Sequence, residues 1–302
     1  MKNDSFVILI DSCGELSLSL RQEYDLDYCA MTVSVDGKEV VASLDYDQGI
    51  TFHDFYEIMR NGTRIFTSAV PQNVFEEKFE HYLKEGKDVL FIGCSTALSA
   101  TVNIATKVAE RLRESYPERK IVIFDTKSSC YGQAFMAIHA SKMRENGASI
   151  EEIHDYLQNN YLRYNQFATV DDLKYLKQAG RVKASAAFFG NLFKVHPIII
   201  SDVNGANTAV KKVKGKKAAL LTLAEEAIAS AEDIDHEPIF VGHCDDLNAA
   251  EFVKTAILSK LPNANVIVGP IGPIVGASTG PGTIGVFTFG KKTALDYVNA
   301  DK

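Results

Sequence analysis

Several features that would indicate particular protein classes are missing from this sequence of 302 residues. No stretch approaches the roughly 20 consecutive apolar residues that a membrane span needs, and the first residues lead into a strand-like segment instead of a signal peptide. The five cysteines are an odd number without C-x-x-C spacing, which favours neither a disulfide framework nor a zinc site. Trp is absent, but 17 Phe and 12 Tyr suffice for a large core. We therefore expect a cytoplasmic protein with reduced, buried cysteines, no metal and no cofactor.

An excess of positive charge is also missing. Lys and Arg number 32 against 39 Asp and Glu, which gives a formal net charge of −7 and a pI near 5.6. Because duplex binding depends on phosphate neutralisation by excess Lys and Arg, nucleic acid is not the expected partner. No G-x-x-x-x-G-K-[ST] motif occurs, which argues against a Walker-type NTPase. The function is therefore to be sought in a pocket.

The first half of the chain alternates apolar runs with segments of helical period. Residues 6–11, 89–94 and 120–126 are typical of strands buried on both faces, and residues 74–83 and 104–112 carry apolar side chains on one helical face. This order predicts a doubly wound, mostly parallel sheet, in which ligands bind at the carboxyl ends of the strands. The polar residues expected at those ends are Asp11, Ser12, Ser95, Thr96, Asp125 and Thr126.

The second half mixes helices with hairpins. Residues 196–200 and 208–213 are predicted to be paired strands around a turn at Asn204–Gly205, and alternating helices and strands follow to residue 289. We expect two domains of about 150 residues each. The predicted fold is α/β, with an N-terminal doubly wound domain over residues 1–163 and a C-terminal mixed α/β domain over residues 164–302.

A glycine-rich segment near the C-terminus contains a G-x-G-x-x-G match at Gly280, Gly282 and Gly285. The dinucleotide fingerprint must open a helix, whereas this match leads into the β-rich residues 286–289, so we reject that interpretation. The wider segment 269–285 is predicted to be a structured loop that allows close backbone approach.

The most informative motif is Gly93-Cys-Ser-Thr-Ala97, between a predicted strand and a predicted helix. Three interpretations remain open. Ser95 and Thr96 could cap the helix, which is the safest from spacing alone. They could form an anion cradle with free N–H groups. Ser95 could also be a hydrolase nucleophile in a G-x-S-x-G-like elbow, with Asp202 and His243 as available partners.

Three other motifs have a structural default. Thr67-Ser68 precedes a predicted helix, where capping is the default, although a second hydroxyl pair facing Ser95 would make a carboxylate site. The lysines between residues 211 and 217 form a basic cluster that is usually a solvated face and less often a docking or phosphate-steering patch. Residues 243–246 contain metal-ligand types but no second pair, so we predict no metal there.

Seven motifs follow one another along the chain. They are Ile10-Asp-Ser12, Thr67-Ser-x-x-Pro71, Ser95-Thr-Ala-Leu-Ser-Ala-Thr101, Asp125-Thr-Lys-Ser128, Asp172-Leu-x-x-Leu176 with Gly180-Arg181, His196-Pro-Ile198, and Gly272-Pro-x-x-Gly276 with Thr279-Gly-Pro-Gly282. No single motif is specific, but their combined order and spacing is. In this order the motifs resemble those of the DegV family of bacterial fatty-acid-binding proteins over essentially the whole chain.

The resemblance implies a long-chain fatty acid buried in an inter-domain hydrophobic tunnel. Its carboxylate would be held by the hydroxyls of Thr67, Ser95 and Thr96 and by the backbone of Ala97. The resemblance also implies a separate fatty acid kinase as partner, to which the bound acid is presented, and no enzymatic activity of this chain. A serine esterase using Ser95 remains the alternative function.

This sequence departs from the family pattern near the implied head group. Ser95-Thr96-Ala97 replaces the usual Ser-Ser-Gly, and Ala100 replaces a later glycine. Ser278, before Thr279, replaces a histidine that can contact the head group, and Lys214 fills the basic position that relatives carry before a helix. The resemblance thus implies binding of the free acid, whereas the missing histidine weakens the expectation of kinase-coupled turnover.

Overall fold

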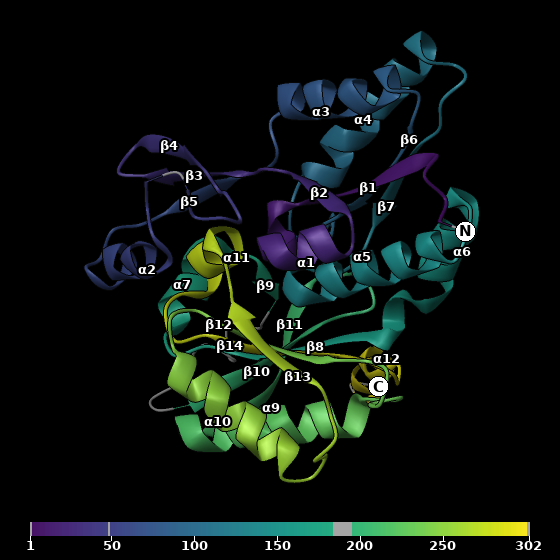
Figure 1. Cartoon of the computed structure of the whole chain (residues 1–302). Coiled ribbons are helices and arrows are strands. Elements are labelled where there is room, and N and C mark those ends of the chain that lie inside the picture. Colours follow the sequence, from purple (N-terminus) through teal and green to yellow (C-terminus); the bar gives the residue numbers. More distant parts are fainter. Residues whose placement is uncertain (1, 48, 184–194, 301–302) are drawn as a thin grey trace. The chain divides into compact units, whose positions relative to one another are not determined.

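The computed structural model describes residues 2–47, 49–183 and 195–300 of the chain, with the side chains of residues 298–300 left out. The chain divides into two compact units. The first unit holds residues 1–49 and 67–161, and the second holds residues 50–66 and 162–302. Most of the second unit follows residue 162, but the segment 50–66 also belongs to it, although the residues before and after that segment belong to the first unit (Figure 1).

The first unit contains a four-stranded, all-parallel sheet in the order β2-β1-β6-β7. Its strands are Leu26–Cys29 (β2), Phe6–Asp11 (β1), Asp88–Gly93 (β6) and Ile121–Asp125 (β7). The two central strands β1 and β6 are almost entirely buried, as their continuous apolar sequences predict. This confirms the parallel N-terminal sheet.

Helices cover both faces of this sheet (Figure 1). The pair α3 and α4 packs together on one face, and the pair α5 and α6 packs together on the other, which is the doubly wound arrangement. The helices of this unit are α1 (Leu18–Glu23), α3 (Gln72–Lys84), α4 (Thr101–Ser115), α5 (Cys130–Glu145) and α6 (Ile150–Asn160), with a 3₁₀ turn η1 (Ser12–Gly14) after β1. A second 3₁₀ turn, η2 (Tyr161–Arg163), lies at the boundary between the units.

A separate small sheet has three strands in the order β4-β3-β5. The strands are Thr32–Val35 (β3), Lys38–Val41 (β4) and Phe66–Ser68 (β5). Asp36 and Gly37 join β3 to β4, both with positive φ, as a two-residue hairpin turn of type I′ requires.

The second unit is built on a seven-stranded mixed sheet in the order β13-β12-β14-β8-β10-β11-β9. The strands are Tyr164–Thr169 (β8), Val182–Lys183 (β9), Val195–Ser201 (β10), Asn207–Lys214 (β11), Ile239–His243 (β12), Val266–Pro270 (β13) and Ile284–Phe289 (β14). Pairing of β10 with β11 is antiparallel, and β12 with β13 is parallel, so this unit is the predicted mixed α/β domain.

The helices of the second unit form two packed groups, one of α9 and α10 and one around α11. Helices α9 (Lys216–Ser230) and α10 (Leu247–Leu258) pack on the sheet over an apolar core that includes Leu223, Val253 and Val286. Helix α11 (Pro273–Thr279) contacts α7 (Leu173–Ala179) and α2 (Phe52–Arg60), and α12 (Thr293–Ala300) ends the chain. In the described part of the chain, no helix is long and apolar enough to cross a membrane.

Two sequence predictions about hydroxyl caps are wrong. Helix α4 begins only at Thr101, and its cap residue Ala100 makes no side-chain hydrogen bond, so Ser95 and Thr96 do not cap it. Helix α3 is preceded by Pro71, again without a side-chain cap. In both places a loop separates the hydroxyl residues from the helix start. For Ser95 and Thr96, the interpretations as an anion cradle or as part of a nucleophile elbow therefore remain.

The glycine-rich segment 269–285 also differs from the prediction of a loop, because it contains the helix α11. Pro273 stands in the first turn of this helix, where its fixed φ and missing N–H are tolerated. The residues of the G-x-G-x-x-G match lead into β14, as predicted. Residues 184–193 are rich in small and aromatic side chains, which makes them a candidate wall of the acyl tunnel that the resemblance implies, but they lie outside the described residues.

Candidate functional site

The loop between β6 and α4 carries the most informative motif. Ser95 is fully buried, its N–H donates to the carbonyl of Ser128 at 2.9 Å, and its hydroxyl oxygen accepts from Ala97 N–H at 3.2 Å. Its carbonyl accepts from the N–H groups of Leu98 and Ser99. These bonds fold the loop into tight turns that leave Ala97 exposed while Ser95 points into the unit.

Thr96 is connected to the turn after the neighbouring strand β7. Its hydroxyl donates to Oδ2 of Asp125 at 2.5 Å, and its N–H donates to Oδ1 at 3.3 Å. Lys127 Nζ lies 2.6 Å from the same Oδ2 and 3.5 Å from Thr96 Oγ1. These hydrogen bonds connect the carboxyl ends of the neighbouring strands β6 and β7. The Thr96 hydroxyl hydrogen is donated to Asp125 and is not available to another acceptor.

The same β7 turn presents a buried hydroxyl without a partner. Ser128 is 2% exposed, and among the described residues its Oγ makes no hydrogen bond. Its carbonyl accepts from Ser95 N–H, which places the two serines side by side. Buried polar atoms are nearly always paired, so an unpaired one beside a candidate anion site requires an explanation.

The Thr67-Ser68 segment is tied to the same region. Val70 N–H lies 3.4 Å from Oγ1 of Thr101, which in turn shares a hydrogen bond of 2.8 Å with Ser99 Oγ. Thr67 is half-buried, and its hydroxyl makes no hydrogen bond within the described ranges. The segment that follows Thr67 and the loop that follows Ser95 are thus connected through Val70 and Thr101.

Asp11 holds the start of this loop from the adjacent strand β1. Its carboxylate accepts from Cys94 N–H at 2.7 Å and from Cys13 N–H at 2.9 Å, and the residue is fully buried. Burial raises the pKa of Asp11 above its ordinary value, although the two N–H donors oppose the shift. Asp11 therefore fixes the backbone that leads into Ser95.

A hollow of about 370 Å³ lies at the other end of the parallel strands. It is lined by the first residues of β1 and by charged side chains, among them Lys2, Asp25, Asp27 and Lys87. Because its rim is ionic, with Lys2 paired to Asp25, it suits water better than an acyl chain.

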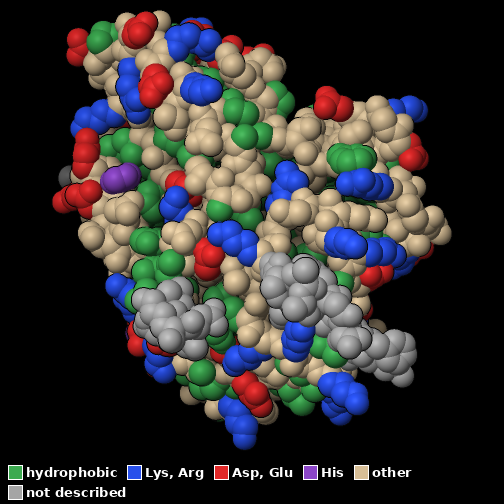
Figure 2. All heavy atoms as spheres, turned by 180° about the vertical axis from the view of Figure 1, so that it is seen from behind, with side chains coloured by type: hydrophobic (Ala, Val, Ile, Leu, Met, Phe, Trp, Pro, Cys, Tyr) green, Lys and Arg blue, Asp and Glu red, His purple; other side chains and the backbone are tan. Residues whose placement is uncertain are grey.

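The other predicted site residues belong to the second unit. Ser278 and Thr279 end α11; the Thr279 hydroxyl donates to the carbonyl of Val275 at 3.0 Å, whereas Ser278 Oγ has no hydrogen-bond partner among the described residues. Lys214 is exposed at the end of β11. On the face drawn in Figure 2, Lys and Arg side chains share the surface with Asp and Glu side chains, unlike the continuous basic surface of a duplex-binding protein.

The residues proposed as partners of a serine nucleophile do not form a catalytic pair. Asp202 accepts from Asn204 N–H at 2.9 Å, from Ala206 N–H at 3.0 Å and from the Thr208 hydroxyl at 3.1 Å, so it shapes the β10–β11 turn. His243 is buried, and its Nδ1 has no partner among the described residues. A triad needs a hydrogen bond from its acid to its histidine, and Asp202 and His243 share none.

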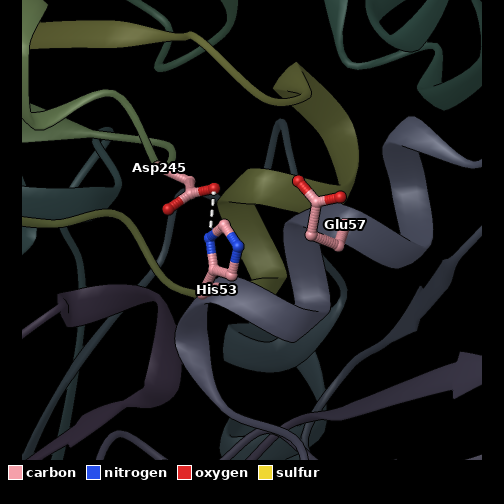
Figure 3. Close-up of side chains that lie close together, drawn as sticks. All are labelled: His53, Glu57 and Asp245. Carbon is pink, nitrogen blue, oxygen red and sulfur yellow. Dashed lines mark hydrogen bonds and ion pairs between the residues drawn. The ribbon is translucent and has the colours of Figure 1, made fainter.

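A cluster that the sequence did not indicate joins α2 to the loop after β12. His53 Nδ1 lies 2.9 Å from Asp245 Oδ2, and Glu57 follows His53 by one helical turn (Figure 3). These three residues are of metal-binding types. Arg60 Nη1, however, contacts both Asp245 Oδ2, at 2.5 Å, and Glu57 Oε1, at 2.7 Å. The positive charge between the two acids is therefore supplied by the chain itself.

Comparison with known proteins identifies the family. Residues 5–291 match the model described as "Uncharacterised protein, DegV family". A DegV domain-containing protein of Clostridium perfringens is 33% identical over 285 residues, 94% of this chain and 97% of that protein. Among solved structures, a stearic-acid-binding protein of Eubacterium ventriosum has a TM-score of 0.83 at 25% identity, covering 96% of this chain and all of that one. A fatty-acid-binding DegV family protein from Thermus thermophilus has a TM-score of 0.85 at 24% identity, with coverage of 96% and 100%. The chain belongs to the DegV family.

Proposed function

We propose that this protein binds a long-chain fatty acid and holds its carboxylate at the carboxyl end of β6. The observation that supports the proposal is the contact between two hydroxyl-bearing segments. Thr67 is half-buried, its hydroxyl has no partner in the described part of the chain, and its segment contacts the loop bearing Ser95. The similar protein of Eubacterium ventriosum is described as binding stearic acid, which is a ligand of this class.

The energetics assign different tasks to the two ends of the ligand. A C16 to C18 acid carries about 15 methylenes, whose burial contributes on the order of 12 kcal/mol before the cost of ordering the chain. Each hydrogen bond to the charged carboxylate adds only about 1.5 to 3 kcal/mol. An enclosed apolar path for the tail would set the affinity, and the hydroxyls would set the orientation and discriminate against neutral lipids.

The proposal includes presentation of the bound acid to a separate fatty acid kinase. No catalytic group is needed on this chain for that role, since the carboxylate only has to remain reachable. By the family resemblance, Ser278 stands at a position expected to hold a histidine, so this position offers no imidazolium to an acyl phosphate. We accordingly expect binding of the free acid to be stronger than binding of the acyl phosphate.

The test is native purification followed by solvent extraction and mass spectrometry of the released lipid, together with titration of delipidated protein with stearate. Thr67→Val removes the unpaired hydroxyl at nearly constant volume and should weaken stearate binding about tenfold. Thr106→Val is the matched control, because the Thr106 hydroxyl donates to the carbonyl of Val102 within α4. Repeated absence of fatty acid and of stearate binding would refute the proposal.

A further inference from the structure

We propose that the turn after β7 completes the carboxylate site, with the Ser128 hydroxyl as a hydrogen-bond donor and the Lys127 ammonium as the charge that selects a carboxylate over a neutral head group. The inference rests on the proposed function and assigns two residues to it. Neither residue was singled out for ligand binding by the sequence.

The first argument is the unpaired hydroxyl of Ser128. The side chain is buried at 2% exposure, and its Oγ makes no hydrogen bond in the described residues. Leaving a buried donor unsatisfied costs about 1 to 3 kcal/mol. The hydroxyl lies on the residue whose carbonyl accepts from Ser95 N–H at 2.9 Å, so a carboxylate beside Ser95 would supply the missing acceptor.

The second argument concerns the Thr96 hydroxyl. A hydroxyl has one proton, and that of Thr96 is donated to Asp125 Oδ2 at 2.5 Å. Thr96 Oγ1 therefore offers only lone pairs, which repel a carboxylate. A donor or a positive charge must come from a neighbouring group if an anion is to settle at this position.

Lys127 is the cation placed to do so. Its Nζ lies 3.5 Å from Thr96 Oγ1 and 2.6 Å from Asp125 Oδ2, and the side chain is 36% exposed. Its backbone is held as well, because Lys127 N–H donates to Asp125 Oδ1 at 3.1 Å in a turn with a φ of 53°. Asp125 thus fixes the orientation of both Thr96 and Lys127, and acts as a positioning residue.

The hydroxyl is tested with Ser128→Ala. Because alanine removes a buried donor that has no partner, the ligand-free variant should be at least as stable as the wild type, while its affinity for stearate falls about tenfold. Ser141→Ala is the matched control: Ser141 is also buried, but its hydroxyl donates to the carbonyl of Tyr24, so this variant should lose stability and keep its stearate affinity.

The charge is tested with Lys127→Met, titrated with stearate and with octadecanol. The variant should lose about tenfold in stearate affinity and little in octadecanol affinity, since only the carboxylate is charged. Lys127→Arg keeps the charge and should restore the preference for stearate. Lys107→Met, which removes an exposed lysine from the middle of α4, should change neither affinity.

The outcomes separate this inference from the proposed function. Wild-type binding of stearate combined with unchanged stearate affinity in Ser128→Ala and Lys127→Met overturns the inference and leaves the proposed function intact. A loss of stability in Ser128→Ala without a loss of affinity likewise assigns the hydroxyl to the fold alone. A wild-type protein that binds neither stearate nor octadecanol refutes both.

Discussion

Gly276 in α11 is expected to be indispensable because of one neighbour, Tyr56 of α2. A Cβ at position 276 would lie 2.1 Å from Tyr56 Oη and 2.8 Å from its Cζ. Tyr56 is fully buried and donates to the carbonyl of Ile271 at 2.5 Å, so its ring cannot move aside without breaking that bond. Gly276→Ala therefore both crowds the Tyr56 ring and displaces its hydroxyl from the Ile271 carbonyl.

The magnitude follows from three contributions. Overpacking of a dense core costs about 1 to 3 kcal/mol, and a buried carbonyl left without its donor costs about 1 to 3 kcal/mol. Alanine in place of glycine in a helix returns about 1 kcal/mol. We expect Gly276→Ala to lower the free energy of unfolding by about 3 kcal/mol, and Tyr56→Phe alone to lower it by about 1 to 3 kcal/mol.

The two changes should not be additive. In the Tyr56→Phe background the oxygen that the new methyl group meets is gone and the hydrogen bond is already lost, so the double variant should be more stable than the sum predicts by at least about 1 kcal/mol. This coupling is measured by urea unfolding, followed by far-UV circular dichroism. The free energies are fitted to the unfolding transition whose midpoint shifts in the Tyr56→Phe variant.

Gly86→Ala is the control for the backbone contribution. Gly86 has a φ of 79°, and a Cβ there would meet no atom within 4 Å. Its cost should add to that of Tyr56→Phe without coupling. Additive costs for Gly276→Ala and Tyr56→Phe would show that the contact between Gly276 and Tyr56 is not what excludes a side chain, and would refute the reasoning.

Two further predictions concern charges in the first unit. Burial acts to raise the pKa of Asp27, but hydrogen bonds from Lys78 and Tyr82 outweigh it and hold the pKa below its ordinary value of 3.8. A carboxylate whose pKa is lower in the folded state than in the unfolded state stabilises the fold at pH values above the unfolded-state pKa. This stabilisation is lost as the pH falls through the folded-state pKa. Asp27→Asn should therefore be less stable than the wild type at pH 7, with a difference that shrinks below pH 3.8 in urea unfolding; a pH-independent difference contradicts this. Arg144 is 2% exposed in its side chain, pairs with the Asp25 carboxylate at 3.1 Å and donates to that residue's carbonyl at 2.8 Å. Arg144→Met should lower the free energy of unfolding by about 3 kcal/mol, and a loss below about 1 kcal/mol would show that the buried guanidinium contributes little.

The elements were predictable where the sequence pattern is local. Strands β1 and β6 appear in the sequence as continuous apolar runs, because both of their faces are buried. Helix α7 carries local signals of the same kind at its ends, since Asp172 caps its first turn and Gly180 ends it with a φ of 66°. Periodicity and end residues are properties of a few neighbouring positions, so one sequence suffices for them.

The helix starts near the hydroxyl motifs were not predictable in this way. Spacing favoured capping by Ser95, Thr96 and Thr67, yet α4 begins at Thr101 and α3 follows Pro71. Whether a hydroxyl caps a helix depends on how the preceding loop folds, and here hydrogen bonds to another strand's turn fold it. The insertion of α2 into the second unit was also not predicted, because it depends on contacts such as that between Tyr56 and Ile271, which are far apart in the chain.

The sequence by itself determined the parallel sheet, the family and the residue types at the strand ends. Buried strands appear as apolar runs, and the residues that end them are their neighbours in the sequence. Only the tertiary structure decided which of those residues hold one another. The Thr96 hydroxyl donates a hydrogen bond to Asp125, whereas the Ser128 hydroxyl has no hydrogen-bond partner among the described residues. Pairing of hydrogen-bond donors depends on distances between segments about 30 residues apart, and a linear pattern does not contain those distances.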